Sequence, residues 1–137
     1  FVRSADELRA MGRELWAAGG TTSTIRMVLK EDGIGISLSD VGLPAGNSNR
    51  LWYKNHWEAN YVLAGKGDVT NLETDEVWDL APGVLYCVGP KDRHSMRADT
   101  DMHLLSVFNP ALQGDEMHDE DGALAPSGPV PPGPADG

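Results

Sequence analysis

The sequence has one cysteine, Cys87, in 137 residues, so no disulfide can form within the chain. Stability therefore has to come from core packing, helped by a metal or a partner subunit. The sequence also lacks a run of 18 apolar residues and a basic-then-apolar leader, so neither a membrane-spanning helix nor a secretion signal is visible. We expect a single cytoplasmic domain, because 137 residues match one hydrophobic core.

Basic residues are few as well. Lys and Arg number 11 against 21 Asp and Glu, which gives a formal net charge of −10, and no basic stripe offsets it. An acidic chain of this kind is repelled by phosphate backbones and by anionic lipid headgroups. We therefore expect neither nucleic acid nor a membrane as a partner.

One helix is expected at the start of the chain. Ser4 and Glu7 have the spacing of a capping box, and apolar residues follow at helical spacing until Gly19 and Gly20. This pattern predicts a short amphipathic helix over about residues 5 to 18.

From Thr22 onward, short runs of β-branched and aromatic residues are broken every 8 to 12 residues by Gly, Pro, Asn or Asp. This rhythm is typical of an antiparallel sandwich or barrel and predicts an all-β jelly roll. Gly65-Lys66-Gly67 is expected to form a hairpin turn that places the strands on either side next to each other. The predicted strands cover about residues 23 to 30, 35 to 41, 50 to 54, 58 to 64, 67 to 72, 76 to 80, 84 to 88, 94 to 98 and 102 to 108.

Residues 123 to 137 are rich in Pro, Gly and Ala, and they lack the large apolar groups that offset the entropy of ordering. We expect a single domain over residues 1 to 122 and a disordered or loosely packed tail after it. An extended Pro-rich segment that binds a partner is the alternative.

Glu58, Tyr86 and His94 come from three places in the chain that a jelly roll brings to one pocket. Glu58 precedes Gly65 by seven residues, and His94 follows a turn at residues 89 to 92. An O, O, N donor set suits Fe(II), with Mn(II) or Zn(II) as alternatives, because no thiolate is present to select zinc. Taken singly, these residues read as a paired carboxylate, a core aromatic and a turn histidine, but their joint spacing favours a metal site.

Four further residues are candidates for substrate chemistry. Glu116 and His118 are two apart, so in an extended segment they would face one side and could act as acid, base or anchor. An acidic surface loop is the alternative. His56 is in phase with Glu58 and could line the same cavity or be a structural histidine. Arg26 could hold a carboxylate through its guanidinium fork or face outward as a surface charge.

Four blocks of the sequence together resemble ectoine synthase, a family of the cupin superfamily. They are WYKNHWEA at 52 to 59, KDRH at 91 to 94, FNP at 108 to 110 and EMHDEDG at 116 to 122. The resemblance spans about residues 2 to 125. It implies a dimeric cupin jelly roll that holds an iron ion and closes the small molecule N-γ-acetyl-L-2,4-diaminobutyrate to the cyclic amidine ectoine, with loss of water.

The resemblance also implies roles for individual residues. Metal ligands would be Glu58, Tyr86 and His94, and Glu116 and His118 would be the catalytic acid and base, with His56 in reserve. The family's pattern of substrate contacts falls on Arg26, Tyr53, His56, Phe108, Glu116 and His118, and Trp52 is added as a possible pocket wall.

Three positions depart from the family pattern. Thr22 stands where a Trp is usual, Val41 where a Thr is usual and Ser106 where a Cys is usual. The change at Thr22 predicts a larger cavity, unless Trp52 or Trp57 turns inward. Alternatives are therefore another metal-dependent cupin enzyme, such as a lyase or a dioxygenase acting on a different amino-acid-like substrate, or a binding cupin without turnover.

Overall fold

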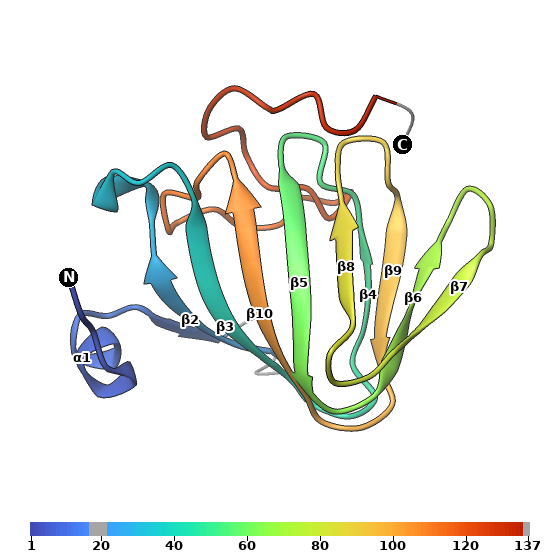
Figure 1. Ribbon diagram of the computed structural model, residues 1–137, viewed down its shortest axis with the longest axis horizontal. Helices are drawn as coiled ribbons and strands as arrows, with labels where there is room; N and C mark the ends of the chain where they lie inside the picture. The colour runs from blue at the N-terminus through green and yellow to red at the C-terminus, as the bar shows by residue number, and fades with distance from the viewer. Residues whose placement is uncertain (17–21, 136–137) are drawn as a thin grey trace.

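The computed structural model describes residues 1–16 and 22–135, and its strands form two antiparallel sheets around a common core (Figure 1). One sheet has the order β1-β2-β3-β10-β5-β8 and the other β4-β9-β6-β7. The predicted all-β jelly roll is confirmed. The elements are α1 Ala5–Ala10, β1 Glu14–Trp16, β2 Ser23–Val28, the 3-10 turn η2 Lys30–Asp32, β3 Ser37–Leu43, β4 Ser48–Leu51, β5 Trp57–Ala64, β6 Gly67–Asn71, β7 Val77–Leu80, β8 Leu85–Val88, β9 His94–Ala98 and β10 Met102–Asn109.

The core contains two apolar clusters with a polar layer between them. On β10 the inward residues are Met102 and Leu104 in the first cluster, then Ser106, then Phe108 in the second. Successive inward positions on a strand are two residues apart, so Ser106 lies between the clusters. The buried polar residues of the barrel interior are therefore surrounded by apolar side chains on both sides.

The helical prediction is correct only for its first half. The capping box at Ser4 and Glu7 is present, but α1 ends at Ala10. Gly12 has a φ of 77°, and the amide of Arg13 donates to Leu8 O at 2.9 Å, which is the reversal that a left-handed glycine allows at a helix end. The chain then continues as β1, paired with β2. The predicted stop at residues 19 and 20 lies outside the described residues.

The expected hairpin at Gly65 is also wrong in one respect. β5 pairs with β10 and β8, whereas β6 pairs with β7 and β9, so the turn carries the chain from one sheet to the other. Gly65 has a φ of 88°, and a Cβ there would overlap the backbone of Asp101 and Met102. The glycine is needed because the turn passes directly against the start of β10, rather than because two neighbouring strands are joined.

After Gly122 the described part of the chain contains no helix or strand. It runs across the open end of the barrel, above β5, β8 and β9 (Figure 1). Ala123, Leu124 and Ser127 are nevertheless buried, with exposed fractions of 1%, 4% and 4%. Composition did not predict this packing. Within residues 1–16 and 22–135, no helix is long and apolar enough to cross a membrane.

Candidate active site

The candidate residues lie along rows that cross the larger sheet. Arg26 pairs with Ser39, Ser39 with Ser106, Ser106 with Asn60, and Asn60 with Tyr86. Residues that are directly opposite each other on neighbouring strands project to the same face of a sheet. Arg26 and Tyr86 are therefore the two ends of one row on the inner face.

Glu58 lies on the next row, opposite Phe108 on one side and Val88 on the other. Its side chain is buried, and the hydroxyl of Ser106 donates to Oε2 at 2.9 Å. Burial raises the pKa of Glu58 to about 7, although the bond from Ser106 opposes the shift. A nearby cation would restore the ionised form, because it offsets the cost of a buried negative charge.

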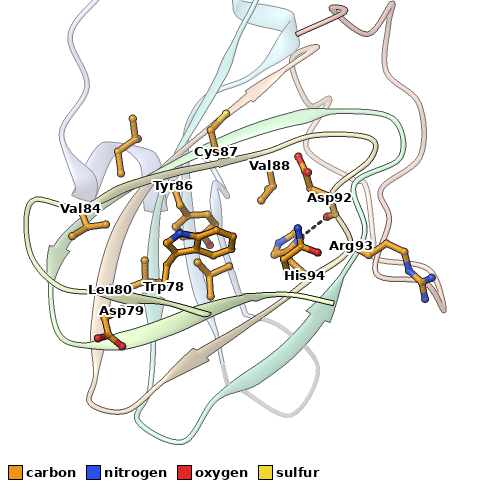
Figure 2. Close-up of a pocket in the computed structure, with 13 residues that line it drawn as sticks. Trp78, Asp79, Leu80, Val84, Tyr86, Cys87, Val88, Asp92, Arg93 and His94 are labelled. Carbon is orange, nitrogen blue, oxygen red and sulfur yellow. Dashed lines mark hydrogen bonds between the residues drawn. The ribbon is translucent and has the colours of Figure 1, made fainter. Parts of the chain in front are cut away.

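His94 presents one free ring nitrogen to the interior. The turn before it is closed by a bond from the Gly89 amide to Asp92 Oδ2 at 2.8 Å. His94 Nδ1 donates to Asp92 O at 2.9 Å, shown as a dashed line in Figure 2. Nε2 is then unprotonated, buried and without a hydrogen-bond partner among the described residues. A histidine with one nitrogen fixed by a carbonyl and the other left free has the arrangement of a metal ligand.

Tyr86 completes the donor set. Burial, together with the charge of Glu58, raises the pKa of its phenol well above the usual range. A carboxylate, a phenol oxygen and a free imidazole nitrogen are donors that suit a divalent cation. The positive charge of such a cation would favour the ionised forms of Glu58 and Tyr86. Among the described residues, His, Cys, Asp and Glu alone do not make a three-residue metal site, so a metal held by Glu58 and His94 would need Tyr86 as its third protein ligand. Cys87 is exposed and contributes no thiolate.

A cavity of about 350 Å³ reaches Tyr86 and His94 between β7 and β8, strands that do not pair with each other (Figure 2). Trp78 and Val84 also line it. The predicted substrate contacts are absent from its described lining. Two of the three metal-ligand candidates, Tyr86 and His94, therefore line this side cavity, and His94 also contacts Tyr53.

On the substrate side, Tyr53 is the central contact. Its hydroxyl lies 3.1 Å from His118 Nε2, and its ring centroid lies 5.2 Å from that of Phe108 and 5.8 Å from that of His94. The ring of His56 meets Phe108 edge-on, with centroids 5.8 Å apart. The structure thus brings four of the predicted substrate residues into one cluster beside the His94 ligand candidate.

Glu116 and Arg26 carry opposite charges that influence each other near this cluster, although no ion pair joins them within the described residues. Burial opposes ionisation of Glu116, but the amides of Gln113 and Gly114 donate to its carboxylate at 2.7 and 2.8 Å and hold its pKa below the usual value. Burial lowers the pKa of Arg26, and the charge of Glu116 opposes that shift. The Nε of Arg26 is buried with no partner in the part of the chain that the structure describes. A guanidinium N–H in this position can bind an added anion.

Glu116 and His118 lie in an irregular loop and not in an extended strand, so their two-residue spacing did not predict their placement. Within the described residues, no side-chain hydrogen bond or ring contact joins Trp52 to the cluster. Its indole N–H donates to Pro90 O at 2.8 Å, and its ring lies under Lys54 and Arg93. Trp52 as a substrate contact stays a prediction.

Two of the family departures have clear surroundings. Val41 packs against the first apolar cluster, and Ser106 contacts Glu58. Thr22 is half-buried just before β2. No sequence pattern indicated the role of Asp92 O or that of Ser127, whose hydroxyl lies 3.0 Å from His56 Nε2.

Comparison with known proteins places the chain in one family. The family model for ectoine synthase matches residues 1–127. The chain belongs to the ectoine synthase family. It is 45% identical over 122 residues to the L-ectoine synthase of Oceanobacillus iheyensis, covering 89% of this chain and 94% of that protein. It is 37% identical over 127 residues to the L-ectoine synthase of Halomonas elongata, covering 93% of each.

Solved structures of similar proteins have the same fold. The crystal structure of ectoine synthase from P. lautus superposes with a TM-score of 0.80 at 34% identity, covering 89% of this chain and 86% of that one. An RmlC-like cupin from Shewanella frigidimarina, at 18% identity and a TM-score of 0.61, covers 74% of this chain and 86% of that one and shares the fold alone. The predicted cupin fold is confirmed. The protein is a carbon–oxygen lyase of the ectoine synthase type, acting on a small molecule in ectoine biosynthesis.

Proposed function

We propose that this ectoine synthase family member closes N-γ-acetyl-L-2,4-diaminobutyrate to ectoine and releases water. The observation that carries the proposal is the row from Arg26 to Tyr86, which has an unpartnered guanidinium N–H at one end and a metal-ligand candidate at the other. Four strand steps of about 4.8 Å separate the two Cα atoms by roughly 19 Å. Both side chains extend inward from that row, which brings their polar ends closer together than their Cα atoms.

In the reaction, the α-amine nitrogen bonds to the acetyl carbonyl carbon, and the carbonyl oxygen leaves as water after gaining two protons. A divalent cation held by Glu58, Tyr86 and His94 would supply Lewis acidity at that carbonyl, with Fe(II) as first choice and Mn(II) or Zn(II) as alternatives. The protein's own side chains have to fold the substrate, move the protons and exclude water.

Arg26 binds the α-carboxylate through its free N–H. Glu116, which is ionised because two amides donate to it, holds the α-ammonium nearby. The amine must lose a proton before it attacks, and His118 is the candidate base, because its Nε2 contacts the Tyr53 hydroxyl beside the cluster. His56 is the reserve acid or base. The buried rings of Tyr53 and Phe108 would exclude water from the reacting groups, which matters because water would reverse the condensation.

One experiment tests this function directly. The protein is loaded anaerobically with Fe(II), incubated with N-γ-acetyl-L-2,4-diaminobutyrate, and followed by mass spectrometry and NMR. We expect a product lighter by one water with the signals of ectoine. Full metal occupancy with unchanged substrate would rule out this function.

The side chain of Val41, which has no hydroxyl, favours a second candidate function with a different substrate. This residue packs against the first apolar cluster and offers no hydroxyl to a polar substrate group. A buried polar group that loses a partner costs about 1 to 3 kcal/mol. The alternative is the same scaffold and metal acting on a different amino-acid-like substrate as a cyclase, lyase or dioxygenase. The assay is a competition between N-γ-acetyl-L-2,4-diaminobutyrate and an analogue that carries one extra methylene. Faster reaction of the longer substrate would favour this alternative.

We also propose that the protein is a homodimer. Exposed apolar side chains gather on the outer face of the larger sheet, where Tyr61, Leu63 and Leu85 have exposed fractions of 43%, 40% and 62%. A subunit interface would remove this surface from water. Light scattering should give twice the chain mass, and Leu85→Asp should give the monomer. A cytoplasmic setting stays a prediction from composition.

A further inference from the structure

The segment after Gly122 reaches the candidate active site through one side chain. Ser127 Oγ lies 3.0 Å from His56 Nε2, and the exposed fractions of the two residues are 4% and 0%. The two residues are separated by 71 positions in the sequence. A serine from a Pro/Gly-rich tail is thus enclosed beside a histidine that belongs to the candidate catalytic set.

Backbone contacts fix the tail independently of that bond. Asn55 Nδ2 donates to Leu124 O at 2.9 Å, Lys30 Nζ donates to Ser127 O at 2.5 Å, and Trp57 Nε1 donates to Pro131 O at 2.8 Å. All three acceptors are main-chain carbonyls. Barrel side chains therefore hold the tail by its main-chain carbonyls, and the Ser127 hydroxyl remains available to bond to His56.

The imidazole of His56 has one nitrogen engaged and one free. Nε2 bonds to Ser127, whereas Nδ1 is buried with no hydrogen-bond partner within residues 1–16 and 22–135. Phe108 restrains the ring edge-on at an interplanar angle of 88°. Without the serine, the ring would lose its one hydrogen bond among the described residues, and the edge-on packing against Phe108 supplies no polar contact to orient it.

We propose that Ser127 is a positioning residue: its hydroxyl holds the His56 imidazole so that Nδ1 stays directed at the substrate. This inference rests on the proposed function, in which His56 belongs to the acid–base set. It assigns the tail a part in the active site, in place of the role of a solvated extension. The alternative is that the Ser127 bond only helps to anchor the tail.

Three substitutions separate these two roles. Ser127→Ala removes the hydroxyl from His56, and Ser127→Thr keeps it. Asn55→Ala removes a tail anchor whose side chain bonds to Leu124 O and not to the His56 ring. We expect Ser127→Ala to lower kcat about 10-fold, the factor that corresponds to about 1.4 kcal/mol, with KM within about 2-fold. Ser127→Thr should recover most of kcat, and Asn55→Ala should change it less than about 2-fold. Equal losses in Ser127→Ala and Asn55→Ala would overturn the proposal.

A second measurement does not depend on turnover. In metal-free, ¹⁵N-labelled protein, the ring nitrogens of the four histidines are resolved by long-range ¹H–¹⁵N correlation, and His56→Gln assigns the signals of His56. Ser127→Ala should move the Nε2 signal of His56, and Asn55→Ala should leave it in place. An unmoved signal would overturn the inference. If the wild-type protein makes no ectoine, the proposed function fails, but this spectrum still decides whether Ser127 holds His56.

Discussion

The Ser106 hydroxyl donates a hydrogen bond to Oε2 of Glu58 at 2.9 Å. A position that departs from the family pattern therefore contacts a candidate metal ligand directly. The bond favours the ionised carboxylate, whose pKa burial raises to about 7. Ser106→Ala should therefore weaken metal binding near pH 7, by about 10- to 100-fold as for other supporting partners of metal ligands. Competition with a chromogenic chelator measures the dissociation constant.

The matched control is Ser39→Ala. Ser39 is buried and lies opposite Ser106 on β3, and within the described residues no hydrogen bond joins its side chain to Glu58. It should leave the metal affinity within about 2-fold. Equal affinities for wild type and Ser106→Ala would show that the hydroxyl does not support the ligand.

Metal binding should stabilise the fold through His94. At a free metal concentration 100 times the dissociation constant, the free energy of unfolding rises by about 2.7 kcal/mol, which corresponds to a Tm shift of about 5 to 10 °C in a domain of this size. His94→Ala should abolish the shift, measured by calorimetry with Fe(II), Mn(II) and Zn(II) in turn. His103→Ala is the control, because His103 pairs with Asp40 on the outer face of the sheet. A shift that survives in His94→Ala would place the metal elsewhere.

Arg26 should act mainly on substrate binding. Arg26→Lys keeps a positive charge but loses the guanidinium fork, and hydrogen bonds to charged groups contribute about 1.5 to 3 kcal/mol. We expect KM to rise about 10- to 100-fold, with a smaller change in kcat, in steady-state assays of ectoine formation. Arg97→Lys, which changes an exposed arginine paired with Asp68, should be neutral. An unchanged KM in Arg26→Lys would exclude the carboxylate contact.

The positions of most strands were predicted from the sequence, but their order and the contacts between candidate site residues were not. Nine strands were predicted because alternating apolar residues and turn residues report local backbone preference. β1 and the early end of the helix were not predicted, because the helical spacing of apolar residues continues past Gly12, whose left-handed φ ends the helix. The bond of His94 Nδ1 to Asp92 O, and that of Ser127 to His56, depend on three-dimensional placement that no local pattern encodes.

Gly65 and Gly46 provide a paired test of the sheet-to-sheet turn. Both have left-handed φ values, 88° and 85°, but a Cβ at Gly65 overlaps the backbone of Asp101, whereas a Cβ at Gly46 meets no atom within 4 Å. Gly46→Ala should cost only the conformational strain of about 1 to 3 kcal/mol. Gly65→Ala should cost more, because β10 would have to move. Urea denaturation compares them, and equal losses would contradict the close approach.

Stability in acid should depend on Asp32. Arg3 donates to its carboxylate through two guanidinium nitrogens at 3.1 and 2.7 Å, and the amide of Leu29 donates at 2.9 Å. These bonds, that of Arg3 foremost, hold the pKa of Asp32 well below its usual range. A carboxyl with a lowered folded-state pKa contributes stability that is fully present above its unfolded pKa of about 3.9, and that is lost as the pH falls below it towards the folded-state pKa.

Asp32→Asn should therefore lower the free energy of unfolding at pH 7. The difference from wild type should shrink as the pH falls below about 4, because the unfolded wild-type chain then binds a proton at Asp32 that the folded protein does not bind. Urea denaturation at pH 7 and at pH 3 measures both differences. Asp6→Asn is the matched control, since Asp6 is 95% exposed in its pair with Arg9 and should change stability little at either pH. A difference between wild type and Asp32→Asn that stays constant from pH 7 to pH 3 would mean that Asp32 does not stabilise the fold through its charge.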